Sequence, residues 1–183
     1  SDVCSSDLDM QSWAYIQMLA LALGAAVSSM AAQNIGAGQW QRVSDIARYG
    51  LLFNFLLSGV PVLLIYLVET QAVGLFLPAN SPAIEIAVHM NHIILWSYPL
   101  FGISMVLSGV VRAAGAVMVP LAVLVVAMLV VRQPLAEYGS AHWGADGLWW
   151  SFSLAAIVAA VLSSAYYLAG SWRSATMRVG APT

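Results

Sequence analysis

The sequence has little charge and no lysine. Only 8% of its 183 residues are charged, and its six basic residues are all arginine. A soluble domain carries roughly a quarter charged residues, so this chain lacks the polar surface that water requires. The formal net charge is −2. Without a basic patch to hold a phosphate backbone, the sequence argues against a nucleic-acid partner.

Cysteine is equally scarce, because Cys4 is the only one. A single cysteine excludes an internal disulfide and every metal motif built from several cysteines. The first ten residues, SDVCSSDLDM, hold three aspartates and no apolar core, so we predict no cleavable signal peptide there. The opening octapeptide resembles translated sequencing-adapter sequence. We therefore expect residues 1–9 to be a leader that is not native.

Apolar residues take the place of charge, with 61% hydrophobic residues and a mean hydropathy of +0.85. A membrane-spanning helix needs about 20 mainly apolar residues. Five segments meet that length and predict an all-α, multi-pass membrane protein with a helical bundle over residues 10–172 and a tail at 173–183. The predicted spans are about 13–32, 46–68, 86–111, 113–131 and 147–169.

Turn-forming residues separate these segments. They lie at 36–38, at 77–82 (LPANSP), at 112–115 and at 139–147. Such short connections predict antiparallel neighbours within one bundle.

The arginines predict which side of the membrane each loop occupies, because cytosolic loops are enriched in basic residues. Loops after the first, third and fifth spans share one side and hold all the arginines but Arg132. We therefore expect that side and the C-terminal tail to be cytosolic, at a cell inner membrane. The first span would then enter from outside, which suggests that an earlier span precedes it. The arginines of the predicted cytosolic side are Arg42, Arg48, Arg112, Arg173 and Arg178.

Three motifs follow one another along the chain. Residues 32–38 (AQNIGAG) end the first span, residues 99–121 contain a G-x-x-R-x-x-G pattern, and residues 144–152 (GADGLWWSF) open the fifth span. Together they resemble the MATE (multidrug and toxic compound extrusion) family, at the end of its second helix in each half, at the junction of its tenth and eleventh helices, and at its last helix. The motif residues are Gln33, Asn34, Gly36, Gly38, Gly109, Arg112 and Gly115.

The resemblance implies that the five spans correspond to helices eight to twelve of a transporter built as two six-helix bundles. The N-terminal half of the same chain would be the partner of this piece, which we expect to be inactive alone. Members of the family export cationic, amphipathic drugs in exchange for protons or sodium ions, by alternating access. The resemblance thus implies a coupling ion but no cofactor, no bound metal and no enzymatic reaction.

Polar residues at helical spacing are candidates for the wall of the substrate cavity. The third span carries such a face, and shorter stripes lie on the first and second spans. Small polar residues also allow close helix packing in membranes, so both interpretations stay open. The cavity candidates are Ser97, Phe101, Ser104 and Ser108, Asn54 with Ser58 and Pro61, and Gln17 with Gly24 and Ser28.

Aromatic residues could stack on a cationic drug. Trp96 is the deeper candidate, whereas Trp149 and Trp150 are expected to anchor a helix end at the membrane interface.

Three prolines are predicted to lie within spans. Pro61, Pro99 and Pro120 could each act as a hinge, since proline removes a backbone hydrogen bond. Proline is also tolerated in membrane helices, where neighbours satisfy the freed carbonyls.

Acidic residues are missing from the middle of every predicted span. Ion coupling across a membrane usually needs a buried carboxylate. The sodium-coupled branch of the resembled family has one in the helix equivalent to the third span, yet that span has none after Glu85. We expect coupling to depend on the other half of the transporter.

Other functions remain open. Glu85, His89 and His92 share one helical face and could relay protons or bind a metal, as in a membrane-embedded hydrolase, although no HExxH pattern is present. A lipid-linked oligosaccharide flippase of the same superfamily would be expected to show more basic residues facing its cavity. A purely structural membrane subunit is the third alternative.

Overall fold

The computed structural model describes the backbone of residues 2–76 and 82–174 and the side chains of residues 18–67, 86 and 88–173. Every described element is helical, which confirms the predicted fold class. The elements are α1 (Asp2–Gly36), α2 (Trp40–Phe76), α3 (Pro82–Ile94), α4 (Ser97–Ala113), α5 (Met118–Val125), the π-helix η1 (Val126–Arg132), α6 (Gln133–Trp143), α7 (Ala145–Ala169) and the 3-10 turn η2 (Ser171–Ser174).

Five helical stretches in the described chain are long and apolar enough to cross a membrane. Helices α3 and α4 together make the third stretch, and α5, η1 and α6 join end to end as the fourth. The five stretches are Met18–Gly36, Trp40–Leu67, Val88–Ala113, Met118–Trp143 and Ala145–Ala169.

The fourth span differs from its prediction at both ends. The chain turns at Gly115, whose φ of +89° suits glycine, so the helix starts at Met118 and not at residue 113. At the other end the helix continues through α6 to Trp143, where residues 139–147 were expected to form a turn. The polar residues after position 131 favoured the prediction of a loop. Such residues are also compatible with the end of an amphipathic helix. The turn itself is confined to Gly144, with a φ of +63°.

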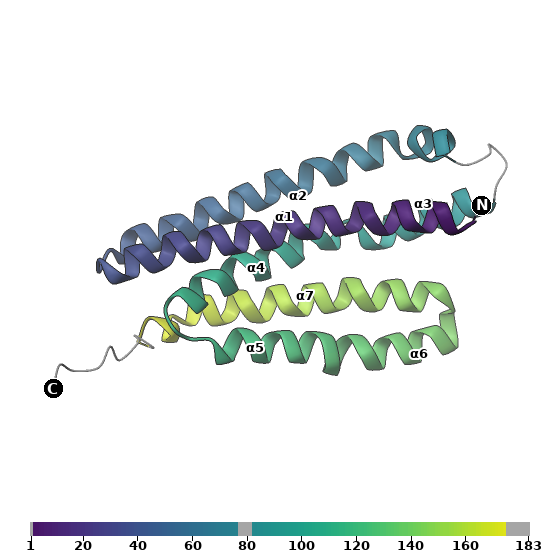
Figure 1. Cartoon of the computed structure of the whole chain (residues 1–183). Coiled ribbons are helices and arrows are strands. Elements are labelled where there is room, and N and C mark those ends of the chain that lie inside the picture. The colour runs from purple at the N-terminus through teal and green to yellow at the C-terminus, as the bar shows by residue number, and fades with distance from the viewer. Residues whose placement is uncertain (1, 77–81, 175–183) are drawn as a thin grey trace.

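Helix α4 is the centre of the bundle. It packs against α1, α2 and α7, while the fourth span packs mainly against α7 (Figure 1). In the third span 72% of the residues of the most apolar stretch are buried, against 33% or fewer in the other four spans. Polar side chains that must be kept away from lipid are therefore best accommodated on α4.

Glycines allow the closest helix contacts. A Cβ added to Gly109 of α4 would lie 2.6 Å from the carbonyl oxygen of Gly24 on α1, which is too short for two non-bonded atoms. Gly139 of α6 and Gly147 of α7 meet in the same way. Small residues at such crossings let membrane helices approach backbone to backbone.

The distribution of side chains is the reverse of a soluble protein's. Large apolar residues of α2 are exposed, including Leu63 (58%) and Leu67 (70%). Hydroxyl and amide groups are buried instead, at Asn54, Ser58, Ser97, Ser104, Ser108, Ser151, Ser153 and Ser163. A surface of this kind needs lipid around it, so the chain is a multi-pass membrane protein.

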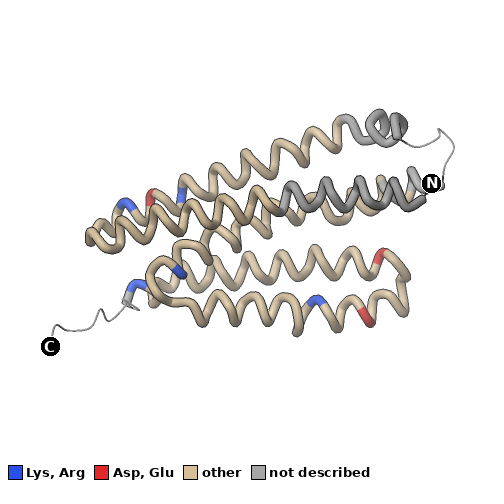
Figure 2. The backbone as a smooth tube through the Cα atoms, in the orientation of Figure 1, with Lys and Arg blue, Asp and Glu red and all other residues tan. Residues whose placement is uncertain are grey.

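One end of the bundle gathers the arginines. Figure 2 shows most of the basic residues at the end where α2 starts, with one acidic residue among them, and two acidic residues at the opposite end. Arg42 and Arg48 lie near the start of α2, Arg112 in the last turn of α4 and Arg173 in η2. Trp172 closes the arginine-rich end from η2. Its indole is 1% exposed, stacks on Tyr167 and donates a hydrogen bond to the Tyr167 carbonyl at 2.9 Å.

Candidate functional site

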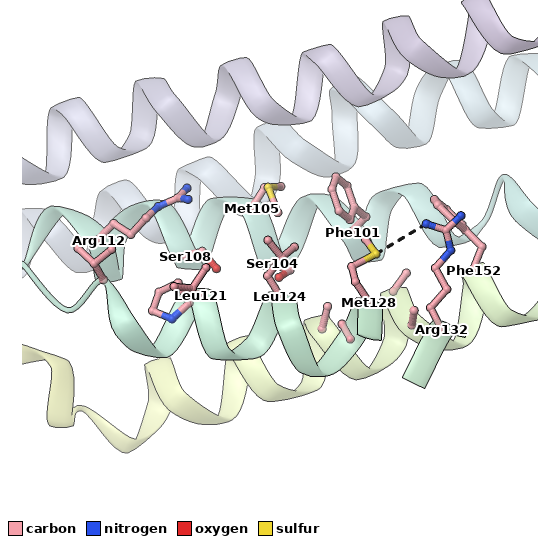
Figure 3. A pocket seen from close by; sticks show the side chains of 16 residues that line it. Phe101, Ser104, Met105, Ser108, Arg112, Leu121, Leu124, Met128, Arg132 and Phe152 are labelled. Atoms are coloured by element: carbon pink, nitrogen blue, oxygen red, sulfur yellow. Dashed lines mark hydrogen bonds between the residues drawn. The ribbon is translucent and has the colours of Figure 1, made fainter. Parts of the chain in front are cut away.

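A cavity of about 170 Å³ lies between α4, the fourth span and α7 (Figure 3). Its walls are almost entirely apolar, with alanines of α7 facing leucine and methionine side chains of the fourth span. Ser104 and Ser108 of α4 supply hydroxyl groups, and Arg112 and Arg132 supply positive charge. The site can therefore hold an apolar group and satisfy a small number of polar atoms.

Part of the predicted α4 face lines this cavity. Phe101, Ser104 and Ser108 all border it. Ser104 also lies 2.9 Å, oxygen to oxygen, from the hydroxyl of Ser163 on α7, and both side chains are buried. Ser104 therefore lines the cavity and also contacts a neighbouring helix, so both interpretations of this helical face apply to it.

Ser97 and Trp96 lie outside the cavity, at the break between α3 and α4. Ser97 is fully buried and donates a hydrogen bond to the Ile94 carbonyl at 2.6 Å, so it caps the end of α3. The ring of Trp96 lies 6.4 Å from that of Trp150. These contacts explain the two positions structurally.

The candidates on α1 and α2 also lie away from this cavity. Asn54 is 1% exposed and donates from Nδ2 to the Pro99 carbonyl at 2.9 Å, filling the space beside Gly102. Ser58 donates to the Asn54 carbonyl within α2 at 2.6 Å. Ser28 is half-buried on α1 and does not border the cavity, and the side chain of Gln17 lies outside the described residues.

Two of the three prolines occupy first turns and not helix interiors. Pro99 is the third residue of α4, just after the break, and Pro120 is the third residue of α5. The first N–H groups of a helix have no partner inside it, so Pro120 removes no helical hydrogen bond, contrary to the expectation. Pro61 alone lies inside a continuous helix.

Arg132 was expected in a loop, and the structure places it inside the fourth span. It ends the π-helix η1, where the backbone is wider than an α-helix. Pro134 follows two residues later, near the start of α6. In a regular α-helix a proline ring clashes with the carbonyl four residues earlier, which here belongs to Val130, and a wider turn avoids that clash. Such π-helical turns are frequent at functional sites. Pro134 within a helix-compatible sequence was the signal that could have revealed this irregularity.

The predicted acidic and histidine cluster is arranged differently. His89 of α3 pairs with Asp146 of α7, Nε2 to Oδ2, at 3.1 Å, and both side chains are about half exposed. The side chain of Glu85 lies outside the described residues. Over the part of the chain whose side chains are described, no three His, Cys, Asp or Glu residues come close enough together to hold a metal ion.

The motif residues build turns and contacts at the arginine-rich end. The Asn34 side chain donates from Nδ2 to the Met30 carbonyl at 2.8 Å, and its backbone carbonyl accepts from the Gln39 N–H at 2.8 Å. Gly38 has a φ of +72° and lets α2 start immediately. Gly109 provides the close contact with Gly24, and Gly115 provides the turn after α4. Both motifs thus set the geometry of helix connections.

Comparison with known proteins identifies the family. The profile of the MatE family matches residues 3–137, which is most of the chain. The chain belongs to the MatE family. Membership explains why the motifs occur together on a bundle of this shape, and the family points to a transporter rather than an enzyme.

Two curated relatives of this MatE chain come from Bacillus subtilis (strain 168). The protein named "Probable multidrug resistance protein YoeA" is 36% identical over 155 residues, covering 84% of this chain and 33% of the relative. "Probable multidrug resistance protein YpnP" is 31% identical over 159 residues, covering 87% and 36%. The chain therefore spans about a third of the length of the curated relatives it matches.

Two solved structures share the fold. The Vibrio cholerae MATE transporter VcmN in the bent form superposes with a TM-score of 0.70 at 20% identity, covering 90% of this chain and 39% of VcmN. An inward-facing multidrug resistance MATE family transporter of the MOP superfamily superposes with the same TM-score at 18% identity, covering 92% and 39%. The MatE chain thus shares the fold of about two fifths of each of these two structures.

Proposed function

We propose that this MatE chain forms most of one helical bundle of a secondary multidrug exporter and one wall of its transport pathway. The exporter would exchange cationic, amphipathic compounds for protons or sodium ions by alternating access. The observation that carries the proposal is the family match over residues 3–137, supported by two relatives named as multidrug resistance proteins. The exchange by alternating access is inferred from the resemblance to the MATE family.

The positions of the arginines support one orientation in the membrane. We propose that the end holding Arg42, Arg48, Arg112 and Arg173 faces the cytosol, because basic residues are enriched on that side of membranes. The C-terminal η2 turn would then lie in the cytosol, and the His89–Asp146 pair would lie on the opposite, outer side of the membrane.

The coupling carboxylate is proposed to lie outside these helices. Among the described side chains, the acidic groups are Asp45 near the start of α2, Glu137 on α6 and Asp146 at the start of α7. All three lie toward a span end. A carboxylate that binds protons or sodium ions along a transport path is expected deeper in the membrane.

Export is tested with the complete reading frame that contains this chain, expressed in bacteria lacking their own major drug exporters. We expect a higher minimal inhibitory concentration of ethidium, a cationic dye. The purified protein in liposomes should move ethidium when a proton or a sodium gradient is imposed. Expression without a change in susceptibility, together with no gradient-driven movement, would refute the proposal and favour a structural subunit.

A further inference from the structure

Arg132 is the deepest charged residue on its helix. It lies about 16 Å along the axis from Trp143. Glu137 lies between it and that end, whereas the helix from Arg132 back to Met118 carries only apolar residues. Arginine side chains carry a permanent positive charge in proteins. A permanent charge inside a membrane span is costly, and such residues usually mark a binding or transport path.

The side chain of Arg132 turns into the span. Its Nη1 lies 3.7 Å from the sulfur of Met128, which is four residues earlier in the helix and further from the Trp143 end (Figure 3). The guanidinium carbon lies 5.2 Å from the centre of the Phe152 ring. A thioether is a weak acceptor, and a ring face occupies few of the five N–H donors. The charge therefore has capacity for a stronger acceptor.

No acidic side chain compensates this charge among the residues the structure describes. None of the residues bordering the cavity is Asp or Glu. The one ion pair found in the described part of the chain, His89 with Asp146, does not involve Arg132. Arg112 of α4 borders the same cavity, and Figure 3 shows the two arginines at its opposite ends. Low-dielectric walls concentrate the resulting positive potential.

The size of the cavity limits the ligand. Its volume of about 170 Å³ is close to the roughly 150 Å³ of an engineered apolar cavity that accepts benzene. It is well below the roughly 300–1,000 Å³ of pockets for drug-sized molecules. The cavity can thus enclose an anionic group with one ring or a few methylene groups.

We propose that this cavity binds the head of an amphipathic anion, a carboxylate, sulfonate or phosphate, with Arg132 as its charge partner. The apolar part of the ligand would lie along Phe101 and Leu124, and the hydroxyl of Ser108 is available to a second polar atom. An anionic lipid and a small aromatic anion share this chemistry. This inference does not depend on the proposed export of cationic drugs, because the ligand of this cavity is an anion.

The test uses the protein from the complete reading frame, purified in phosphatidylcholine nanodiscs. Binding of radiolabelled benzoate and retention of phosphatidylglycerol in native mass spectra are measured, with benzylamine as a cation of matching size. Loss of a charge-assisted contact should make Arg132→Gln bind the preferred anion at least about tenfold more weakly. Arg132→Lys keeps the charge but not the planar fork of N–H donors, so it should bind the anion more tightly than Arg132→Gln and more weakly than the unmodified protein. Arg48→Gln, an arginine outside the cavity, should change nothing.

The outcomes separate the two sources of the anion. Loss of benzoate binding in Arg132→Gln identifies a soluble anion, and loss of phosphatidylglycerol retention identifies a lipid. The inference is overturned if Arg132→Gln leaves both probes unchanged, which would mean that another part of the transporter neutralises the arginine. It is also overturned if the unmodified protein binds benzylamine as tightly as benzoate, a comparison that requires no variant to fold.

Discussion

His89 on α3 and Asp146 at the start of α7 are in hydrogen-bond contact, with Nε2 3.1 Å from Oδ2, and the contact is an ion pair when the imidazole is protonated. The ring of His89 also lies 6.0 Å from that of Trp149, edge to face. These contacts join the third and fifth spans at the end of the bundle opposite the arginines. Because the side chains are 57% and 46% exposed, water and salt screen the pair.

We expect the His89–Asp146 contact to contribute little stability. Exposed pairs typically contribute less than about 1 kcal/mol. A double-mutant cycle with His89→Gln and Asp146→Asn, measured by unfolding in denaturing detergent, should give a coupling energy in that range that shrinks with added salt. A coupling above about 2 kcal/mol would contradict this screened picture.

The Gly24–Gly109 crossing should not tolerate a methyl group. A Cβ on Gly109 would meet the Gly24 carbonyl at 2.6 Å, so α1 and α4 would have to separate. We expect Gly109→Ala to cost about 1–3 kcal/mol of unfolding free energy, the usual range for overpacking. Gly36→Ala is the matched control, since nothing lies within 4 Å of a Cβ there. Equal stability of the two variants would refute the tight crossing.

The Ser104–Ser163 hydrogen bond should show coupling between α4 and α7. Either single alanine substitution leaves a buried hydroxyl without its partner, whereas the double variant removes both groups. Such bonds in membrane proteins contribute about 0.6 kcal/mol on average and rarely more than about 1.7. We therefore expect Ser104→Ala and Ser163→Ala to be less than additive. Strict additivity of the two unfolding free energies would show that the hydroxyls do not interact.

Trp172 should contribute more to the stability of the fold than any other residue of the C-terminal η2 turn. It is 1% exposed within a cluster that includes Val43 and Ala47 of α2 and Val111 of α4. Truncating a buried tryptophan usually costs about 3–5 kcal/mol. We expect a large drop in the midpoint of thermal unfolding for Trp172→Ala and a small one for Trp143→Ala, whose side chain is 66% exposed. The opposite order would mean that η2 does not pack against the bundle.

Cysteine labelling can test the proposed orientation. In a Cys4→Ser background, a cysteine replacing the exposed Gln39 should react with a membrane-impermeant maleimide only from the cytosolic side. A cysteine replacing the exposed Ala145, at the opposite end, should react only from outside. Labelling of both positions from the same side would show that an even number of helices crosses the bilayer between them, which contradicts the three spans found there.

Apolar length made the fold predictable. Segments of about 20 apolar residues have few alternatives to a spanning helix, so the number of spans and the helical class followed from composition. The ends of the fourth span did not follow. Polar residues such as Gln133 and Ser140 resemble a loop in sequence, although a helix emerging from a membrane can carry them.

The candidate site was only partly predictable. Spacing placed Phe101, Ser104 and Ser108 on one face of α4, and the three do border one cavity. Spacing could not tell which neighbour this face meets, so Ser97 of the same stripe caps a helix end. Arg132 was missed because hydropathy alone assigned it to a loop, whereas the helix continues beyond it.

The break between α3 and α4 has a mechanical consequence. The hydroxyl of Ser97 on α4 donates a hydrogen bond to the carbonyl of Ile94, and the hydroxyl of Ser153 on α7 donates one to the carbonyl of Ile93 at 2.7 Å. The end of α3 is thus tied to two helices at once. Any tilt of α3 relative to α4 must break the Ser97–Ile94 bond, which spans the break, and any tilt relative to α7 must break the Ser153–Ile93 bond. The three helices should therefore keep their relative angles for as long as both buried bonds hold.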